Sequence, residues 1–250
     1  METTTCAKKD CEQGQLERVR FFPRQLLTAN DLQQEQGYLR EKQRRHNRFL
    51  HGWGIVCGLD VKQPSASDPF KLTICSGYAL SPQGDEIYVP AAAEFDLSQR
   101  CAGAEANANP CDKKADASAA LKEKKVYVAV KYAECMTRPV RTLPNGCGCD
   151  EMACEYSRIK DGYEVACLDA LPDAYFLQEN KSESVTDLRE ALTKKDQALS
   201  CPECPHDPWV LLAVVTITKN SDEKRKAGSP PFEIGLTYEH RRILASSSML

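Results

Sequence analysis

The sequence predicts an α+β protein dominated by antiparallel β-structure, arranged as a sandwich or barrel, with one long N-terminal α-helix. A charged stretch without proline, from about Thr28 to His51, predicts the helix. Short alternating apolar runs, separated by turn residues between positions 55 and 89, predict a series of short strands. Two longer apolar runs, 125–132 and 209–219, predict central strands. With 250 residues, 42% of them hydrophobic, the chain has enough apolar side chains for one large domain or two small ones.

The start of the helix is marked by Thr28 and Asp31, which have the spacing of a capping box with Asp in place of the usual Glu or Gln. From Thr28 to His51 the chain has no proline and a single glycine, Gly37. Its apolar residues form only a thin stripe, so most of the helix surface is polar. A helix of this kind is either solvated on its own domain or held between partners.

The second half of this helix is strongly basic. Residues 36–50 contain five positive side chains and one negative side chain, a net charge of +4. The predicted partner-contact residues are Arg40, Arg44, Arg45 and Arg48. Three interpretations remain open: an exposed face on the protein's own domain, a surface for another protein, or a nucleic-acid site. The chain as a whole has net charge −3, and no aromatic residues interleave with the basic face, so we expect no nucleic-acid partner.

Glycines end the helix and lead into the predicted β-structure. Gly52 is expected to form the usual left-handed cap, and Trp53 to pack into the elbow between helix and strand. Alternation of apolar and polar residues over 55–62 predicts one strand with a single apolar face. Further short strands near 72–74, 78–80 and 87–89, with a turn at 81–85, predict a β-meander.

The predicted domain division is a flexible tail at 1–16, an N-terminal segment at 17–52 that carries the helix, and a β-rich domain at 53–250. A short strand is expected at 16–22. The Ala-, Asn-, Asp- and Lys-rich residues 91–123 predict a long irregular insertion. Later strands are expected at 125–132, 158–167, 209–219 and 232–238, with a second helix at 184–199.

The thirteen cysteines are the most unusual feature of the composition. Two cysteine-rich loops, 147–154 and 201–206, each precede a predicted strand, and thiolates at C-x2-C spacing can bind zinc. The predicted metal ligands are Cys147, Cys149, Cys154, Cys201 and Cys204, with His206 in reserve. Structural Zn2+ is the cofactor that this pattern suggests. Disulfides and free thiols remain alternatives. The cysteines in strand-like runs are expected to be small core residues: Cys57, Cys75, Cys135 and Cys167.

Common catalytic signatures are absent from the sequence. It contains no GxSxG, HExxH, GxGxxG or phosphate-binding GxxxxGK[ST] motif. We therefore expect no catalytic residues and predict that the protein is not an enzyme. No 18-residue apolar run predicts a membrane span, and no apolar signal-peptide core is present at the N-terminus. A cytoplasmic location follows as an expectation.

Four stretches carry a resemblance to a known family. They are LLTANDLQQEQGYLREKQRRHNRFLHGWGIVCGLDV at 26–61, GYALSPQGDEIYVP at 77–90, the ECMTRPV–CxC–SRIKDGYEV run, and CPECPHDPWVLLAVVTI at 201–217. Together they resemble a group of bacterial proteins encoded beside phage-tail-like contractile injection systems, with HNRFLHGWGIVCGL as the specific part.

That resemblance implies an accessory structural subunit on or around the baseplate of such a particle. Its partners would be baseplate, sheath or tube proteins and, by particle symmetry, further copies of itself. The particle would assemble in the cytoplasm and then stay there, be released or dock on a membrane. Two other function classes stay open: a metal- or thiol-dependent enzyme, and a stand-alone ligand-binding β-sandwich. Aromatic residues make up only 7% of the chain, which disfavours a sugar-binding face.

Overall fold

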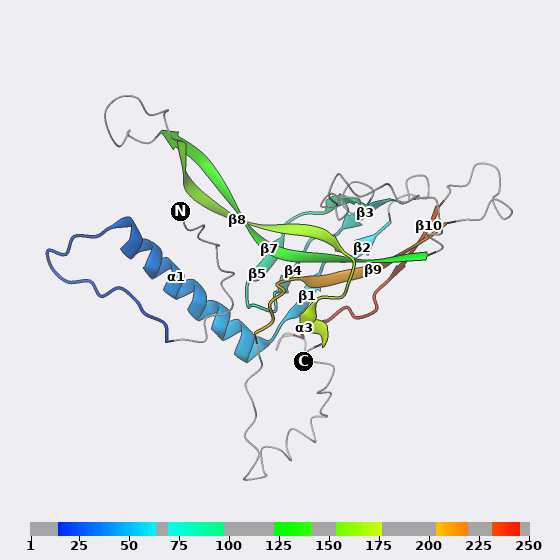
Figure 1. Cartoon of the computed structure of the whole chain (residues 1–250), viewed down its shortest axis with the longest axis horizontal. Coiled ribbons are helices and arrows are strands. Elements are labelled where there is room, and N and C mark those ends of the chain that lie inside the picture. The colour runs from blue at the N-terminus through cyan, green and yellow to red at the C-terminus, as the bar shows by residue number, and fades with distance from the viewer. Residues whose placement is uncertain are drawn as a thin grey trace, which may run out of the picture.

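A computed structural model describes residues 15–63, 70–97, 123–141, 154–176, 204–219 and 232–245 of the chain. Figure 1 shows one long helix beside a body of antiparallel strands in three sheets. The predicted β-dominated α+β class is confirmed. In the part of the chain that the structure describes, no helix is both long enough and apolar enough to cross a membrane.

Helix α1 (Ala29–His46) continues into a π-helical turn, η1 (Asn47–His51). The predicted capping box is confirmed: the Asp31 backbone N–H donates to Thr28 Oγ1 at 3.3 Å, and the Thr28 N–H donates to the Asp31 carboxylate at 2.8 Å. Gly52 has the expected positive φ of 79°, but its ψ of −149° lies outside the left-handed helical region. The strand predicted at 16–22 is wrong, because that segment has no regular secondary structure.

Six short strands follow the helix. They are β1 (Gly54–Gly58), β2 (Val61–Lys62), β3 (Lys71–Ile74), β4 (Gly77–Leu80), β5 (Glu86–Val89) and β6 (Ala93–Asp96). They form two sheets with orders β1-β4-β5 and β2-β3-β6. Because the chain passes from one sheet to the other at each of the steps β1–β2, β3–β4 and β5–β6, the two sheets are halves of one bent three-stranded meander.

The bend explains why the strand predicted over 55–62 is divided in two. Gly58 and Leu59 have φ values of 63° and 56°, which turn the chain between β1 and β2. Two backbone hydrogen bonds hold the bend: the Leu59 N–H donates to the Ser76 carbonyl at 3.2 Å, and the Cys75 N–H donates to the Asp60 carbonyl at 2.8 Å. The alternation of apolar and polar residues in the sequence does not reveal that the chain passes from one sheet to the other.

The predicted insertion at 91–123 is wrong in its first part. Strand β6 lies within that range and pairs with β3, and Phe95 and Leu97 are buried. The i, i+2 spacing of these two apolar side chains was the available signal. Residues 98–122 lie outside the described residues, as do the predicted second helix at 184–199 and the tail at 1–14.

A four-stranded sheet completes the body, with order β10-β9-β7-β8. Its strands are β7 (Glu123–Arg141), β8 (Cys154–Leu168), β9 (Val210–Lys219) and β10 (Phe232–Thr237). Strands β7 and β8 pair from Tyr127–Leu168 out to Arg141–Cys154, whereas β9 pairs with β7 only as far as Val130. Beyond that point the hairpin leaves the sheet as a two-stranded ribbon (Figure 1). The predicted strands 125–132 and 158–167 include the base of this ribbon but not residues 133–141 and 154–157.

The hydrophobic core joins all three sheets. One large cluster contains buried residues from the bent meander and from the inner strands β7 and β9. A smaller cluster surrounds Trp53, which is 4% exposed and lies edge-on to Tyr175 of the short helix α3 (Asp173–Phe176), with ring centroids 4.8 Å apart. The prediction that Trp53 packs into the elbow is therefore confirmed. Residues 241–245 run beside β1, where the Ile55 N–H donates to the Arg242 carbonyl at 2.9 Å.

Candidate functional site: a groove between the helix and the hairpin

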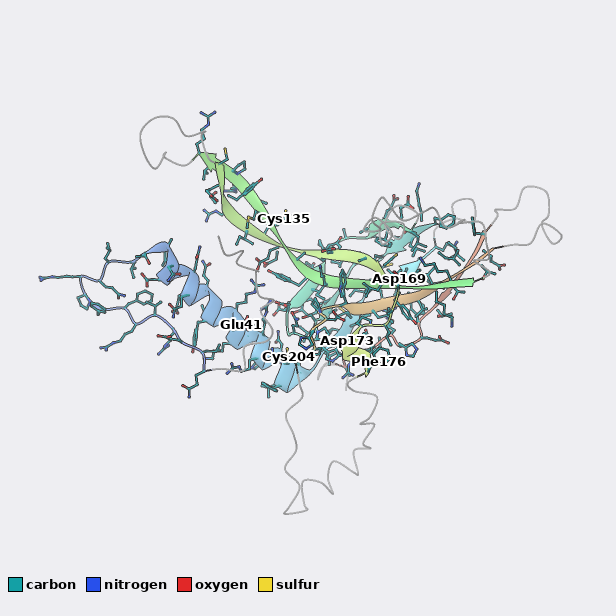
Figure 2. All side chains as sticks on the ribbon, viewed as in Figure 1. Glu41, Cys135, Asp169, Asp173, Phe176 and Cys204 are labelled. Carbon is teal, nitrogen blue, oxygen red and sulfur yellow. The ribbon has the colours of Figure 1, made fainter. Side chains whose placement is uncertain are left out.

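The described residues form a groove of about 1000 Å³. Its walls are helix α1, strands β4 and β5 with the turn between them, and the hairpin of β7 and β8. In Figure 2, Glu41 marks the helix and Cys135 marks the hairpin. Cys135 itself lines the groove. The site is thus built from segments that lie more than a hundred residues apart in sequence, from Arg40 to Tyr163, and that only the fold brings together.

The helix meets the β4–β5 turn at Gly84. This residue has φ 93°, and a Cβ added there would lie 2.2 Å from the Arg44 carbonyl oxygen. The side-chain amide of Asn47, a residue that is 4% exposed, donates to the Gly84 carbonyl at 2.8 Å. The backbone of the helix therefore rests directly on the turn, and only glycine allows that approach.

An ion-pair network surrounds this contact. Arg44 Nε donates to Asp85 Oδ1 at 2.6 Å, and Arg44 Nη1 donates to Glu41 Oε1 at 2.7 Å. Burial acts to lower the pKa of Arg44, but the hydrogen bonds and charges of Asp85 and Glu41 outweigh it and raise that pKa. Arg40 forms a hydrogen-bonded ion pair with Glu134 of the hairpin, and its guanidinium lies 5.2 Å from the centre of the Tyr132 ring.

These contacts change the interpretation of the basic helix face. Arg40 and Arg44, predicted to contact a partner, bind the helix to its own sheet, and Arg48 donates to the Gln83 carbonyl at 3.3 Å. Burial lowers the pKa of Arg48. Arg45 is partly buried on the same helix. The sequence left an own-domain role open, and the signal that would have favoured it is the acidic pair Asp85–Glu86 in the distant turn.

Four tyrosines line the groove in two cross-strand pairs. Tyr78 of β4 lies opposite Tyr88 of β5, and Tyr132 of β7 lies opposite Tyr163 of β8. The Tyr132 hydroxyl donates to Asp161 Oδ1 at 2.7 Å. Burial, followed by the contact with Asp161, raises the pKa of Tyr132. These residues were missed because single tyrosines in separate strands form no local motif.

The acidic residues of the groove have internal partners, whereas one lysine does not. Asp85 accepts from Arg44, and Asp161 accepts from Tyr132. Glu86 is hydrogen-bonded to Tyr78 and, after burial, is the second cause of the raised pKa of that tyrosine. Lys160 also lines the groove and has no ion-pair partner among the described residues. The wall therefore offers an unused positive charge next to aromatic rings.

Two exposed apolar strips flank the groove. The first covers the N-terminal arm and the start of α1, with side chains 46–86% exposed: Phe21, Phe22, Leu26, Leu27, Leu32 and Leu39. The second covers the ribbon, with side chains 45–64% exposed: Met136, Val140, Tyr156 and Ile159. Figure 1 shows the arm, the helix and the ribbon projecting from the same side of the body. Exposed apolar side chains that gather in this way are typical of interaction surfaces.

The predicted metal ligands are placed only in part. Cys204 is disulfide-bonded, and Cys154 is a free, exposed thiol at the start of β8. Cys147, Cys149 and Cys201 lie outside the described residues. Since zinc binds thiolates, Cys204 is not in a metal-binding state in this structure. Within the described ranges, no group of three His, Cys, Asp or Glu side chains could hold a metal ion. The zinc site stays a prediction.

Three of the four cysteines that were expected in the core differ from that expectation: Cys57 and Cys135 are exposed, and Cys75 is half-buried. Cys167 packs against the main core cluster, as expected, but it is disulfide-bonded. A register shift between Ile55 and Cys57 moves Cys57 out of the apolar face of β1, and Cys135 lies in the ribbon beyond the core. Strand-like sequence alone did not reveal either displacement.

Comparisons with known proteins give little information about the role of this chain. No family model matches the sequence, and no curated protein matches it. A comparison with solved structures finds a crystal structure of TssK, with a TM-score of 0.37 and 13% identity. The alignment covers 88% of this chain and 41% of that chain, so the protein spans less than half of the TssK length. These values are too low to establish a shared fold or a shared role.

Proposed function

We propose that the protein is a structural subunit of a phage-tail-like contractile injection particle, an accessory component on or around the baseplate that acts through protein–protein contacts. The observation that carries the proposal is helix α1, which spans 18 residues without one buried side chain and continues an arm of exposed Phe and Leu residues. The proposed role contains no catalytic step.

Helix α1 and the ribbon of β7 and β8 both lack the apolar packing that usually stabilises such elements. Most helices in proteins are stabilised by packing an apolar face, and α1 instead contacts its own domain through polar groups near its C-terminal end. A two-stranded ribbon without a third strand is only marginally stable in water. A partner that covers the exposed strips of the arm and the ribbon would supply the missing burial, at about 25 cal/mol per Å² of apolar area.

The class of partner comes from the resemblance of residues 26–61 and the three later stretches to proteins encoded beside contractile injection systems. This resemblance supports baseplate, sheath or tube proteins as neighbours. Particle symmetry would place several copies of the chain in one assembly, formed in the cytoplasm of the producing cell. The strongest part of the resemblance coincides with α1, η1 and the elbow, which together form the projecting helix and its root.

The test is affinity capture of the tagged full chain from native lysate, with imaging of the eluate and identification of its proteins. Sheath, tube and baseplate proteins on rod-shaped particles are the expected result. A double variant, Leu26→Ser with Leu32→Ser, should reduce their recovery, whereas Phe176→Ser, which changes an apolar side chain on α3 that is about as exposed as Leu32, should not. Recovery of the 27.9 kDa chain alone would contradict the proposed function.

A further inference from the structure

We propose that the groove between α1 and the hairpin is a docking site for an acidic polypeptide segment of a partner subunit. A carboxylate of that segment pairs with Lys160, and an apolar side chain beside it packs on the groove tyrosines. The inference rests on the proposed function, because it names the chemistry of one contact in the assembly, and it can fail while that function stands.

The dimensions of the groove suit a polypeptide segment. A volume of about 1000 Å³ lies at the upper end of the range of small-molecule pockets. The walls are also fixed before anything binds, since Gly84 and Asn47 hold the helix to the turn and Arg40 joins it to Glu134 of the hairpin. A preformed groove lowers the entropic cost of binding an extended segment.

The tyrosines supply the apolar contact. Tyr88 is 63% exposed, so one face of its ring is available to a ligand. The hydroxyl groups of Tyr78 and Tyr132 are already bonded to Glu86 and Asp161, which fixes the position of those rings at the wall. Tyrosine buries a large area at a low cost in side-chain entropy, which is why it is enriched at protein interfaces.

Charge selects an acidic partner. The acidic groups of the wall are used internally, and Lys160 has no ion-pair partner in the part of the chain that the structure describes. The arm, the helix and the ribbon (residues 15–48, 134–141 and 154–161) contain 12 Lys and Arg against 7 Asp and Glu, a net charge of +5, while the whole chain has −3. Such an asymmetry steers and selects a partner surface of opposite sign.

The same charges favour a protein over a nucleic acid as the occupant. Binding to a phosphate backbone depends on several Lys or Arg side chains that each neutralise a phosphate. Arg40 and Arg44 in the groove are already paired with Glu134 and Asp85, which leaves Lys160 alone on the wall for an incoming anion. A single carboxylate next to an apolar side chain matches this arrangement.

The experiment places a photo-crosslinking residue, p-benzoylphenylalanine, at position 88 of the full chain in cells that make the particle. After irradiation, the particle is purified and the crosslinked peptide is identified. The expected peptide comes from another subunit and contains Asp or Glu near the crosslink. Adding Lys160→Glu should lower the crosslink yield about tenfold, which corresponds to about 1.4 kcal/mol.

Lys125→Glu is the matched control, because Lys125 is an exposed lysine on β7 outside the groove and undergoes the same charge change. It should leave the yield unchanged, and both variants should melt at the temperature of the unaltered chain.

The inference is overturned by a crosslink to nucleic acid, by a partner peptide without acidic residues, or by equal losses in the two lysine variants. A purified particle that contains the chain but no crosslink also overturns it, while the proposed function survives. Absence of the chain from any particle refutes the proposed function itself.

Discussion

Replacing Gly84 with alanine should release helix α1 from the body while the sheets stay folded. The new Cβ would lie 2.2 Å from the Arg44 carbonyl oxygen, closer than the 3.0 Å below which real Cβ contacts are essentially absent. The helix or the turn must therefore move by almost 1 Å. The φ of 93° adds backbone strain for any residue with a side chain.

The loss of stability in Gly84→Ala can be calculated from the interactions that this movement breaks. A left-handed conformation costs a residue other than glycine about 1–2 kcal/mol, and a buried hydrogen bond such as that from Asn47 to Gly84 contributes about 1–3 kcal/mol when its donor is left unsatisfied. Together these effects reach about 2–5 kcal/mol. Because no residue of α1 is buried, little hydrophobic energy opposes detachment. The free helix would be marginally stable.

Amide hydrogen exchange resolves this effect by segment. In Gly84→Ala, exchange of residues 29–51 should accelerate by more than one order of magnitude, at about 1.4 kcal/mol per tenfold, while β7 and β9 keep their protection. Gly37→Ala is the control within the helix, because nothing lies within 4 Å of its added Cβ and alanine favours the helix by about 1 kcal/mol. Unchanged protection of α1, or an equal loss in β7 and β9, would refute the reasoning.

Three further outcomes follow from the structure. Hydrogen bonds from the Thr28 side chain and backbone lower the pKa of Asp31, so the cap contributes fully above the ordinary Asp value of about 3.9 and is lost as pH falls through the lower folded value. Helicity measured by circular dichroism should decline there. Thr28→Ala should weaken that pH dependence, because it removes the side-chain hydrogen bond and keeps the backbone one. Tyr175→Phe should destabilise the fold by about 1–3 kcal/mol in denaturant titrations, because the buried Leu211 N–H loses its acceptor. Burial raises the pKa of Tyr175 to about 12, so the contribution of Tyr175 to the free energy of unfolding should be lost as pH rises from about 10 to that value. An absorbance titration in which Tyr175 ionises at the ordinary tyrosine pKa would contradict this prediction. Reduction of the disulfide at Cys204 should lower the melting temperature, by the equivalent of about 2–4 kcal/mol. Mass spectrometry of the unreduced chain should find Cys167 and Cys204 oxidised. Bound zinc with Cys204 as a thiolate would contradict this prediction.

Local features of the fold were predictable because their signals are local. The capping box at Thr28 and Asp31, the turn at 81–85 and the apolar run at 209–219 each depend on neighbouring residues, and each is present as expected. The strand β6 and the ribbon were missed for different reasons. The first was hidden by the polar composition around it. The outer part of the ribbon covers no core, and its few apolar side chains are exposed, so its sequence lacks the regular alternation of a strand with one buried face.

The groove was not predictable, because its parts meet only in the folded chain. Arg44 meets Asp85 across 41 residues, and Arg40 meets Glu134 across 94 residues. A helix face with four arginines signals partners of opposite charge, and the sequence alone does not tell whether they belong to the same chain. The four tyrosines likewise become a set only through the pairings of β4 with β5 and of β7 with β8.

The ribbon has a mechanical consequence. Strand β7 runs without interruption from Arg141 at the exposed tip to Glu123 in the body, and β9 pairs with it along the inner part. A pull on the tip along the strand would load the β7–β9 hydrogen bonds together, in shear, since those bonds are perpendicular to the strand. Among the described residues, helix α1 is attached through separate polar contacts of Arg40, Arg44 and Asn47, and it would peel away from the body one contact at a time. In a particle that generates force by contraction, the ribbon would be the stiff connection of the subunit and the helix its compliant one.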